Sequence, residues 1–201
     1  MPEHRIGHRE QMTEHSAATE SRPAAGLSTL RERAGRRIDC EEAAYSESTR
    51  EDRPLAGYLT LLGIYLGFAG SLAGILKWRK VELPERIDPA DLALLTVATH
   101  KVSRIVTKDP VTSPLRAGFT RFTGPTGEGE IAEEVRGTGL RHAVGELVTC
   151  PFCIGQWVAT LLAFMLVLAP RATRLAASVF AMLTGSDLLQ LAYAKAQTWI
   201  D

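Results

Sequence analysis

Three long apolar segments, separated by polar stretches, dominate the hydrophobic pattern along this chain. Residues 55–76 carry no charge, residues 146–169 become almost continuously apolar after a Cys-Pro-Phe-Cys sequence, and residues 175–194 are apolar around one aspartate. A helix needs roughly 20 mostly apolar residues to cross a bilayer. The pattern therefore predicts an all-α integral membrane protein with about three transmembrane helices, and the lipid bilayer as its first partner.

The first apolar segment carries small residues at alternating steps of four and three, which place them along one stripe of a helix. They are Ala56, Thr60, Gly63, Gly67, Gly70 and Gly74. A stripe without bulky side chains lets another helix approach closely in lipid. We expect it to pack against a partner membrane helix or against another copy of the protein in a homo-oligomer.

The segment 92–106 is amphipathic and follows a helix start, with Asp88 as the capping residue and Pro89 at the first helical position. Lys101 and Arg104 lie opposite its apolar face, and each costs about 2.5–3.5 kcal/mol at the centre of a spanning helix. The pattern predicts a helix that lies in the membrane interface. A crossing helix that pairs these charges with acidic partners is the alternative. The apolar face consists of Leu95, Ala98, Val102 and Ile105.

Two stretches lack an apolar run long enough for a core. Residues 1–53 are rich in Arg, Glu, Ser and Ala, and this composition predicts a mostly disordered N-terminal tail with a helix near residues 29–44. Residues 118–139 are rich in Gly, Thr and Glu and predict a long polar loop, with short strands or turns at its two sides. We expect a solvated acidic loop there, because the spacing of a calcium site is missing. Its glutamates are Glu128, Glu130, Glu133 and Glu134.

These elements divide the chain into a tail (1–53), a first transmembrane helix with a basic flank (54–80) and a membrane domain (88–195). If the amphipathic helix does not cross, most Lys and Arg that flank the helices lie on one side, between residues 77 and 142. The positive-inside rule then places that loop in the cytoplasm and the tail outside. A crossing amphipathic helix weakens this orientation.

The composition mainly argues against certain classes of protein. The 23 Lys and Arg balance 23 Asp and Glu, and a formal net charge of zero gives no argument for a nucleic-acid partner. Three cysteines, two of them in one pair, cannot form the disulfide framework of a small secreted domain.

The Cys150-Pro151-Phe152-Cys153 sequence stands at the mouth of the second apolar segment and is the sharpest chemical feature of the chain. Cys150 suits a helix cap, Pro151 the first helical position, and Cys153 the free amides of the first turn, which favour a thiolate. Three interpretations stay open: an inert or structural pair, a redox-active dithiol, and a zinc site. A zinc site needs further ligands, for which His142, His100 and Cys40 are the candidates.

Glu146 precedes the cysteine pair. If one helix runs from residue 146 to residue 157, Glu146 shares a face with Cys150 and Cys153, and its carboxylate can exchange protons with a thiol. The third apolar segment carries Asp187 near its middle, with Gln190 close by. An acid inside a membrane either serves transport or finds a partner: an arginine or lysine on another helix, or a hydrogen bond in its protonated form.

Several short motifs occur in order along the chain. They are residues 108–116 (KDPVTSPLR), 133–134 (EE), 136–141 (RGTGLR), 145–147 (GEL) and 150–157 (CPFCIGQW). Together they resemble the bacterial membrane-protein family of the domain of unknown function 1360, over about residues 88–195. The resemblance implies a multi-pass protein of the bacterial cell membrane and brings no catalytic residue with it.

The sequence thus favours a structural or interaction component of the bacterial envelope over an enzyme, with no cofactor unless zinc is bound. The first alternative is a membrane thiol-redox or metal-binding protein that uses Cys150 and Cys153. The second is a minor transport component that uses Asp187.

Overall fold

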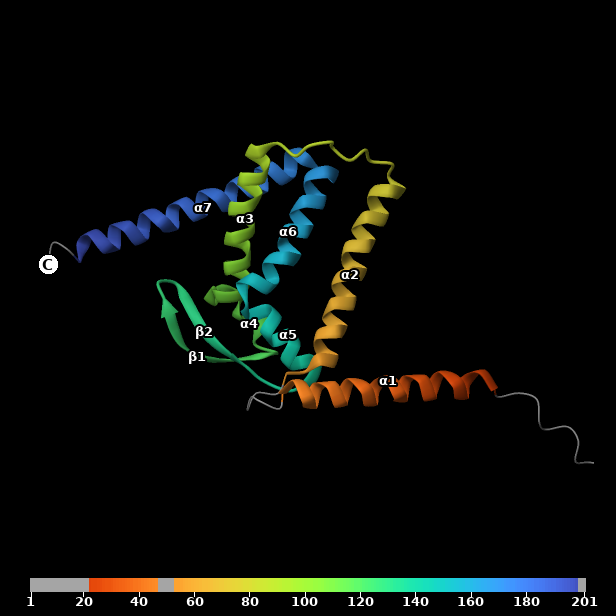
Figure 1. Cartoon of the computed structure of the whole chain (residues 1–201). Helices are drawn as coiled ribbons and strands as arrows, with labels where there is room; N and C mark the ends of the chain where they lie inside the picture. Colours follow the sequence, from red (N-terminus) through yellow and green to blue (C-terminus); the bar gives the residue numbers. More distant parts are fainter. Residues whose placement is uncertain (1–21, 47–52, 199–201) are drawn as a thin grey trace, which may run out of the picture.

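The computed structural model of the chain describes residues 22–46 and 53–198. Within them the protein is mostly helical, and its sheet has two strands (Figure 1). The all-α class is thereby confirmed. The elements are α1 (Arg22–Ser46), α2 (Leu55–Trp78), α3 (Pro89–Lys108), η1 (Pro110–Thr112), α4 (Ser113–Arg116), β1 (Thr120–Gly127), β2 (Glu130–Val135), α5 (Gly139–Thr149), α6 (Pro151–Leu168) and α7 (Pro170–Gln197).

Three of the described helices are long and apolar enough to cross a membrane, and they are α2, α6 and α7. They correspond to the three apolar segments of the sequence. The second segment differs in one respect, because a break at Cys150 divides it into α5 and α6.

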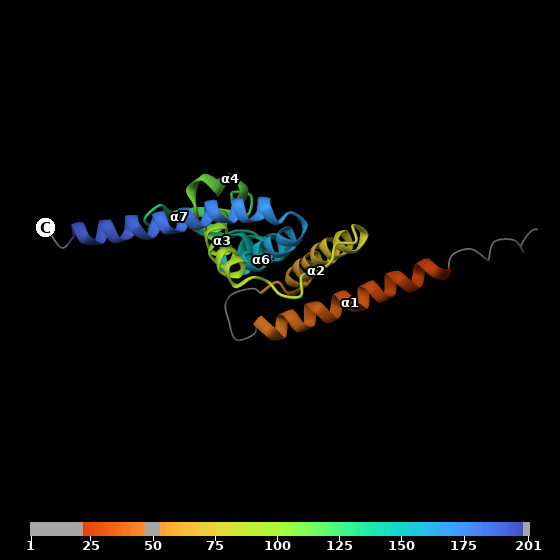
Figure 2. The same cartoon turned by 90° about the horizontal axis from the view of Figure 1, so that it is seen from above.

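α3 and α6 lie side by side and run in opposite directions, with α2 on the far side of α6 (Figures 1 and 2). The first half of α7 packs on α3, and its second half projects away from the bundle (Figure 1). The small core between α3, α6 and α7 consists of Leu95, Ala98, Leu166 and Ala177. α2 joins this group through its aromatic side chains, since Tyr65 and Phe68 contact the Trp157 ring at centroid distances of 5.2 and 5.7 Å.

α3 begins as predicted: Asp88 caps it by accepting a hydrogen bond from the Ala90 amide at 2.9 Å, and Pro89 occupies the first turn. Its buried face is more polar than predicted, because Ser103 and Thr107 are buried where Val102 and Ile105 were expected. Each of the two hydroxyls donates to a carbonyl one turn earlier, at 2.6 and 2.7 Å. Small side chains satisfied within their own helix allow α3 to approach its neighbours closely.

α3 is not one of the three apolar helices, yet it lies beside α6 rather than across its end (Figures 1 and 2). The interfacial placement of this helix stays a prediction. The arrangement favours the alternative, in which α3 crosses together with α6.

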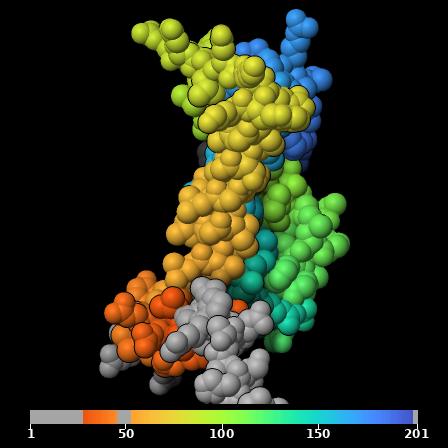
Figure 3. Space-filling model, turned by 90° about the vertical axis from the view of Figure 1, so that its right-hand side faces the viewer, coloured from red at the N-terminus to blue at the C-terminus, as the bar shows by residue number. Residues whose placement is uncertain are grey.

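The small-residue stripe of α2 faces away from α6. A Cβ atom added at Gly63, Gly67, Gly70 or Gly74 would meet nothing within 4 Å. Among the glycines of α2, Gly57 at the start of the helix is the closely packed one, because a Cβ there would lie 2.9 Å from the Ala143 Cβ on α5. Figure 3 shows α2 as the outer helix of this side of the molecule. These four glycines therefore make no close contact within the described residues, and packing of the stripe against a partner helix stays a prediction.

Two predictions about polar stretches are corrected. Most of the predicted polar loop is an antiparallel hairpin, because the strands expected at its two sides are longer than predicted and pair as β1 and β2, with Thr120 opposite Val135 and Gly127 opposite Glu130. In the tail predicted to be mostly disordered, the helix expected near residues 29–44 is longer and forms α1 over residues 22–46, with Leu30, Ala34 and Ile38 at helical spacing. The rest of the predicted tail, residues 1–21 and 47–52, lies outside the described residues.

Candidate functional site

A buried arginine lies where α3 ends. Asp109 is extended (φ −72°, ψ 135°) because it precedes Pro110, so the helix stops at Lys108. The Asp109 carboxylate then accepts a hydrogen bond from the Val111 amide at 2.9 Å and starts the next turn. Through η1 and α4 the chain doubles back and brings Arg116 beneath the end of α3, where it is fully buried.

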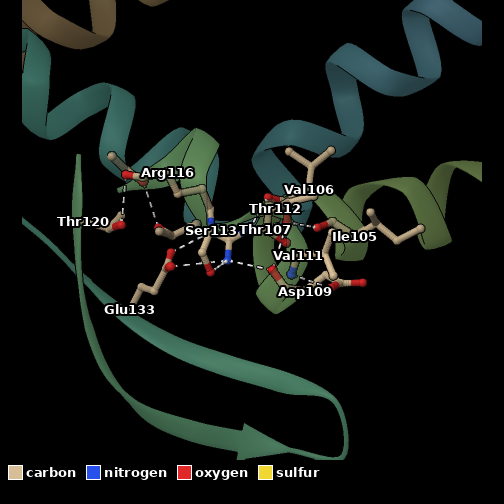
Figure 4. Close-up of polar contacts among 12 residues, drawn as sticks. Ile105, Val106, Thr107, Asp109, Val111, Thr112, Ser113, Arg116, Thr120 and Glu133 are labelled. Atoms are coloured by element: carbon tan, nitrogen blue, oxygen red, sulfur yellow. Dashed lines mark hydrogen bonds and ion pairs between the residues drawn. The ribbon is translucent and has the colours of Figure 1, made fainter. Parts of the chain in front are cut away.

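Every N–H group of the Arg116 guanidinium is engaged (Figure 4). Nε and Nη2 donate to the two carboxylate oxygens of Glu133 on β2, at 2.6 and 3.3 Å. Nη1 donates to the Val106 carbonyl at 2.7 Å and to the Thr112 hydroxyl at 2.6 Å. Nη2 also donates to the Asp109 carbonyl at 3.0 Å. One side chain thus ties together α3, the turn that follows it and the hairpin.

This Arg116 cluster is structural in character. The Glu133 side chain is 6% exposed and the Arg116 side chain 1%, so neither faces a space that a substrate can enter. The prediction of solvated glutamates is therefore wrong for Glu133, and also for Glu130, which is paired with Arg104. One feature of the sequence could have indicated this pair: Arg116 and Glu133 both belong to the short motifs that resemble the family, at residues 108–116 and 133–134.

Ion pairs also join α3 to α7 and to the hairpin. They are Asp91 with Arg174, Lys101 with Asp187, and Arg104 with Glu130. Asp187 thus pairs with a lysine on another helix, the contact that one structural interpretation of this acid expects. Gln190 takes no part in the pair, since its amide donates to Ser186 Oγ of the same helix at 3.2 Å.

The cysteine pair has the predicted helix-start geometry. Cys150 caps α6, and its sulfur accepts a hydrogen bond from the Cys153 amide at 3.2 Å. Pro151 occupies the first turn. Both cysteines are free thiols whose sulfur atoms are in contact, and Cys153 is exposed. This is an arrangement that two-electron oxidation can close into a disulfide.

Glu146 does not share a continuous helix with the cysteine pair. The chain is extended at Cys150 (φ −100°, ψ 109°), so no single helix carries Glu146 and the thiols on one face. The Glu146 carboxylate instead accepts hydrogen bonds from Arg53 at 2.9 Å and from the Tyr58 hydroxyl, and His142 Nε2 lies 3.5 Å from it. This cluster fastens the start of α2 to α5.

The zinc interpretation gains no support from these positions. His142 faces Glu146 and the Gly137 carbonyl. Among the described residues, no group of three or more His, Cys, Asp or Glu side chains is arranged to hold a metal ion.

A cavity of about 880 Å³ lies between α3, the hairpin turn and α7. His100 lines it, together with the Lys101–Asp187 and Arg104–Glu130 pairs. These four charged residues join the walls of the cavity to each other. The cavity is therefore the space left beneath the projecting half of α7.

The motifs and the geometry agree with two comparisons. The family described as protein of unknown function (DUF1360) matches residues 94–193. Sporulation protein YjcA of Bacillus subtilis (strain 168) is 30% identical over 91 residues, which cover 44% of this chain and 77% of that relative. The chain belongs to the DUF1360 family. The DUF1360 region runs from α3 to α7 and so holds the Arg116 cluster and the cysteine pair, whereas α1 and α2 precede it. No solved structure matches the chain.

Proposed function

We propose that the protein is a multi-pass membrane protein of the bacterial envelope that acts as a structural or interaction component. The exposure of its apolar helices carries this proposal. Leu62 and Leu66 on α2 and Leu189 on α7 are 53%, 60% and 74% exposed. Apolar surface in water costs about 25 cal/mol per Å², so lipid or partner helices have to cover these faces. That the relative belongs to Bacillus subtilis agrees with a bacterial protein.

The contacts of the buried charged side chains support a structural role. Arg116, Glu133 and Lys101 are all engaged in contacts that hold elements together. Within the described part of the chain, no buried side-chain nitrogen or oxygen lacks a hydrogen-bond partner.

The same pairs favour α3 as a crossing helix. Lys101 and Arg104, whose burial cost argued against crossing, each have a carboxylate partner, on α7 and on the hairpin. A paired charge inside a bundle is the usual way in which a membrane protein tolerates such residues. With α3 crossing, α2 and α6 run in one direction and α3 in the other, so the hairpin and the cysteine pair lie on the same side as the start of α2.

Photo-crosslinking in living bacteria tests the proposal. We expect the protein to stay in the membrane fraction during alkaline extraction. A photoreactive amino acid at Gly67, on the open stripe of α2, should form one discrete adduct with a protein. The matched control is Leu62, on a bulky face of the same helix, which should react mainly with lipid. Release of the protein by alkali, or equal and diffuse labelling at both positions, would contradict the proposal.

A second candidate function is thiol redox chemistry, favoured by the contact between the Cys150 and Cys153 sulfurs. In this reaction both thiols lose their protons and two electrons pass to a disulfide-bearing partner, which becomes a dithiol. Equilibration of the purified protein with glutathione buffers should then give a reversible disulfide at a potential near that of the cytosol. If the pair stays reduced in all buffers and the Cys→Ser double variant assembles normally, the redox function is rejected and the structural function remains. Protection from alkylation that ends only when a chelator is added would indicate metal.

A further inference from the structure

We propose that α1 is a membrane-surface helix that binds the anionic phospholipid headgroups of the leaflet in which α2 begins. The inference rests on the membrane placement proposed above. Its partner is a lipid surface, and it adds an interaction site in a part of the chain that precedes the family region.

The position of α1 is the first observation. α1 lies crosswise to α2, at the end of the bundle where α2 begins (Figures 1 and 2). α2 carries no charged residue from Leu55 to Leu76. The boundary between lipid and water therefore falls near Arg53, and a helix placed crosswise there runs along that boundary.

The apolar stripe of α1 is the second observation. Leu30, Ala34, Ile38 and Tyr45 follow one another at steps of four, four and seven, so they lie along one face. Leu30 is 61% exposed and Tyr45 66% exposed, so the described part of the protein leaves much of this face uncovered. An amphipathic helix in the interface buries such a stripe at the boundary between headgroups and acyl chains.

The charges of α1 decide the kind of lipid. Residues 28–37 hold four arginines and one glutamate, whereas residues 38–46 hold three acids and no basic residue. Arg31 and Arg37 flank the stripe at about 60° on either side of Ala34, given 3.6 residues per turn. From there their stems can lie on the apolar surface while the guanidinium groups bind phosphate in bidentate fashion. All four arginines are exposed, and they are Arg31, Arg33, Arg36 and Arg37.

Depth-dependent quenching in reconstituted vesicles tests this inference on the full chain. The three native cysteines are replaced by serine, and a fluorophore is attached at Leu30→Cys on the stripe or at Glu32→Cys on the opposite face. A third variant, Ile64→Cys on α2, reports whether the protein has inserted. The vesicles contain phosphatidylcholine alone or an equal mixture with phosphatidylglycerol, and spin-labelled lipid is the quencher.

We expect quenching at position 30 but not at position 32, stronger with phosphatidylglycerol and weaker at high salt. Replacing the four arginines by glutamine should reduce the ratio of surface-bound to free α1 by at least about tenfold in the anionic vesicles. Quenching at position 64 without quenching at position 30 would overturn the inference and leave the membrane protein intact. No quenching at either position would reject both proposals.

Two other results would also overturn it. Equal quenching at position 30 in neutral and anionic vesicles, unchanged by the arginine variant, would mean that α1 inserts without recognising headgroups. Shielding of position 30 that rises with the protein-to-lipid ratio would mean that another copy of the protein covers the stripe.

Discussion

Arg116 illustrates, at the scale of single residues, how a charge is kept inside a protein. Its planar guanidinium donates in several fixed directions, to a carboxylate, two carbonyls and a hydroxyl. The contact with Val106 satisfies a carbonyl in the last turn of α3, which has no partner within the helix, and the contact with Asp109 reaches the residue after it. A lysine has one charged nitrogen and three donors, so it cannot reproduce this pattern.

The first prediction is that Arg116→Lys lowers the free energy of unfolding by about 3 kcal/mol, because Glu133 and the α3 carbonyls lose donors in a buried place. The melting temperature of the detergent-purified protein should fall by several degrees. Arg121→Lys, on the exposed surface of β1, is the matched control and should change stability by less than about 0.5 kcal/mol. Equal melting of both variants would mean that any positive charge serves at position 116.

The second prediction concerns Lys101 and Asp187. Lys101→Met and Asp187→Asn should each destabilise the protein, whereas the double variant should lose less than the sum, by about 0.5–1 kcal/mol. The magnitude is modest because Asp187 is 46% exposed in the absence of lipid. Arg104→Met combined with Asp187→Asn should be additive, since Arg104 is paired with Glu130. An additive cycle for Lys101 with Asp187 would argue against the ion pair.

At the scale of single residues, the sequence predicted the features that depend on neighbouring residues in the chain. The cap at Cys150, the cap at Asp88 and the need of Asp187 for a partner all follow from neighbouring residues. The partners themselves could not be predicted, because Lys101 and Asp187 are 86 residues apart and no local pattern fixes how their helices are placed. Glu146 was assigned to the thiols on the assumption of one continuous helix, and the extended backbone at Cys150 removes that assumption.

At the scale of elements, α2 has two distinct faces. Tyr65 and Phe68 pack inward on Trp157, and the glycine stripe looks outward. Helix type and approximate bounds were predictable for α2, α3 and α7, because their hydrophobic patterns are long. Short strands or turns were expected at the two sides of the polar loop, but their pairing was not, since Glu133 looked like a solvated residue while the arginine that pairs with it stood 17 residues away.

The third prediction compares two glycines of α2. Gly57→Leu should destabilise the protein, because even a Cβ there would lie 2.9 Å from Ala143 and 3.1 Å from the Gly139 carbonyl oxygen. Overpacking of this kind costs about 1–3 kcal/mol. Gly67→Leu should leave the melting temperature of the monomer unchanged and weaken association with another helix, which light scattering in detergent can measure. Unchanged assembly would show that the stripe meets only lipid.

At the scale of the whole molecule, the end of α2 and the hairpin lie at opposite ends of the bundle (Figure 1). The interfacial placement of residues 92–106 would put both on one side of the membrane. The antiparallel arrangement of α3 and α6 leads to the opposite expectation.

The fourth prediction follows from this arrangement. Cysteines introduced at Arg79 and Arg121 in a chain without native cysteines should be labelled by a membrane-impermeant reagent from opposite sides. Arg86, in the segment that follows α2, is the control for the first side, and Arg136 for the second. Labelling of positions 79 and 121 from the same side would show that α3 lies in the interface.

The Lys101–Asp187 pair also sets a condition on biosynthesis. Lys101 leaves the ribosome 86 residues before its partner, so α3 reaches the translocon with an uncompensated charge. An isolated lysine raises the cost of insertion. α3 should therefore settle between its neighbours only after α7 has been made, and a nascent chain stopped before Asp187 should hold α3 at the membrane surface.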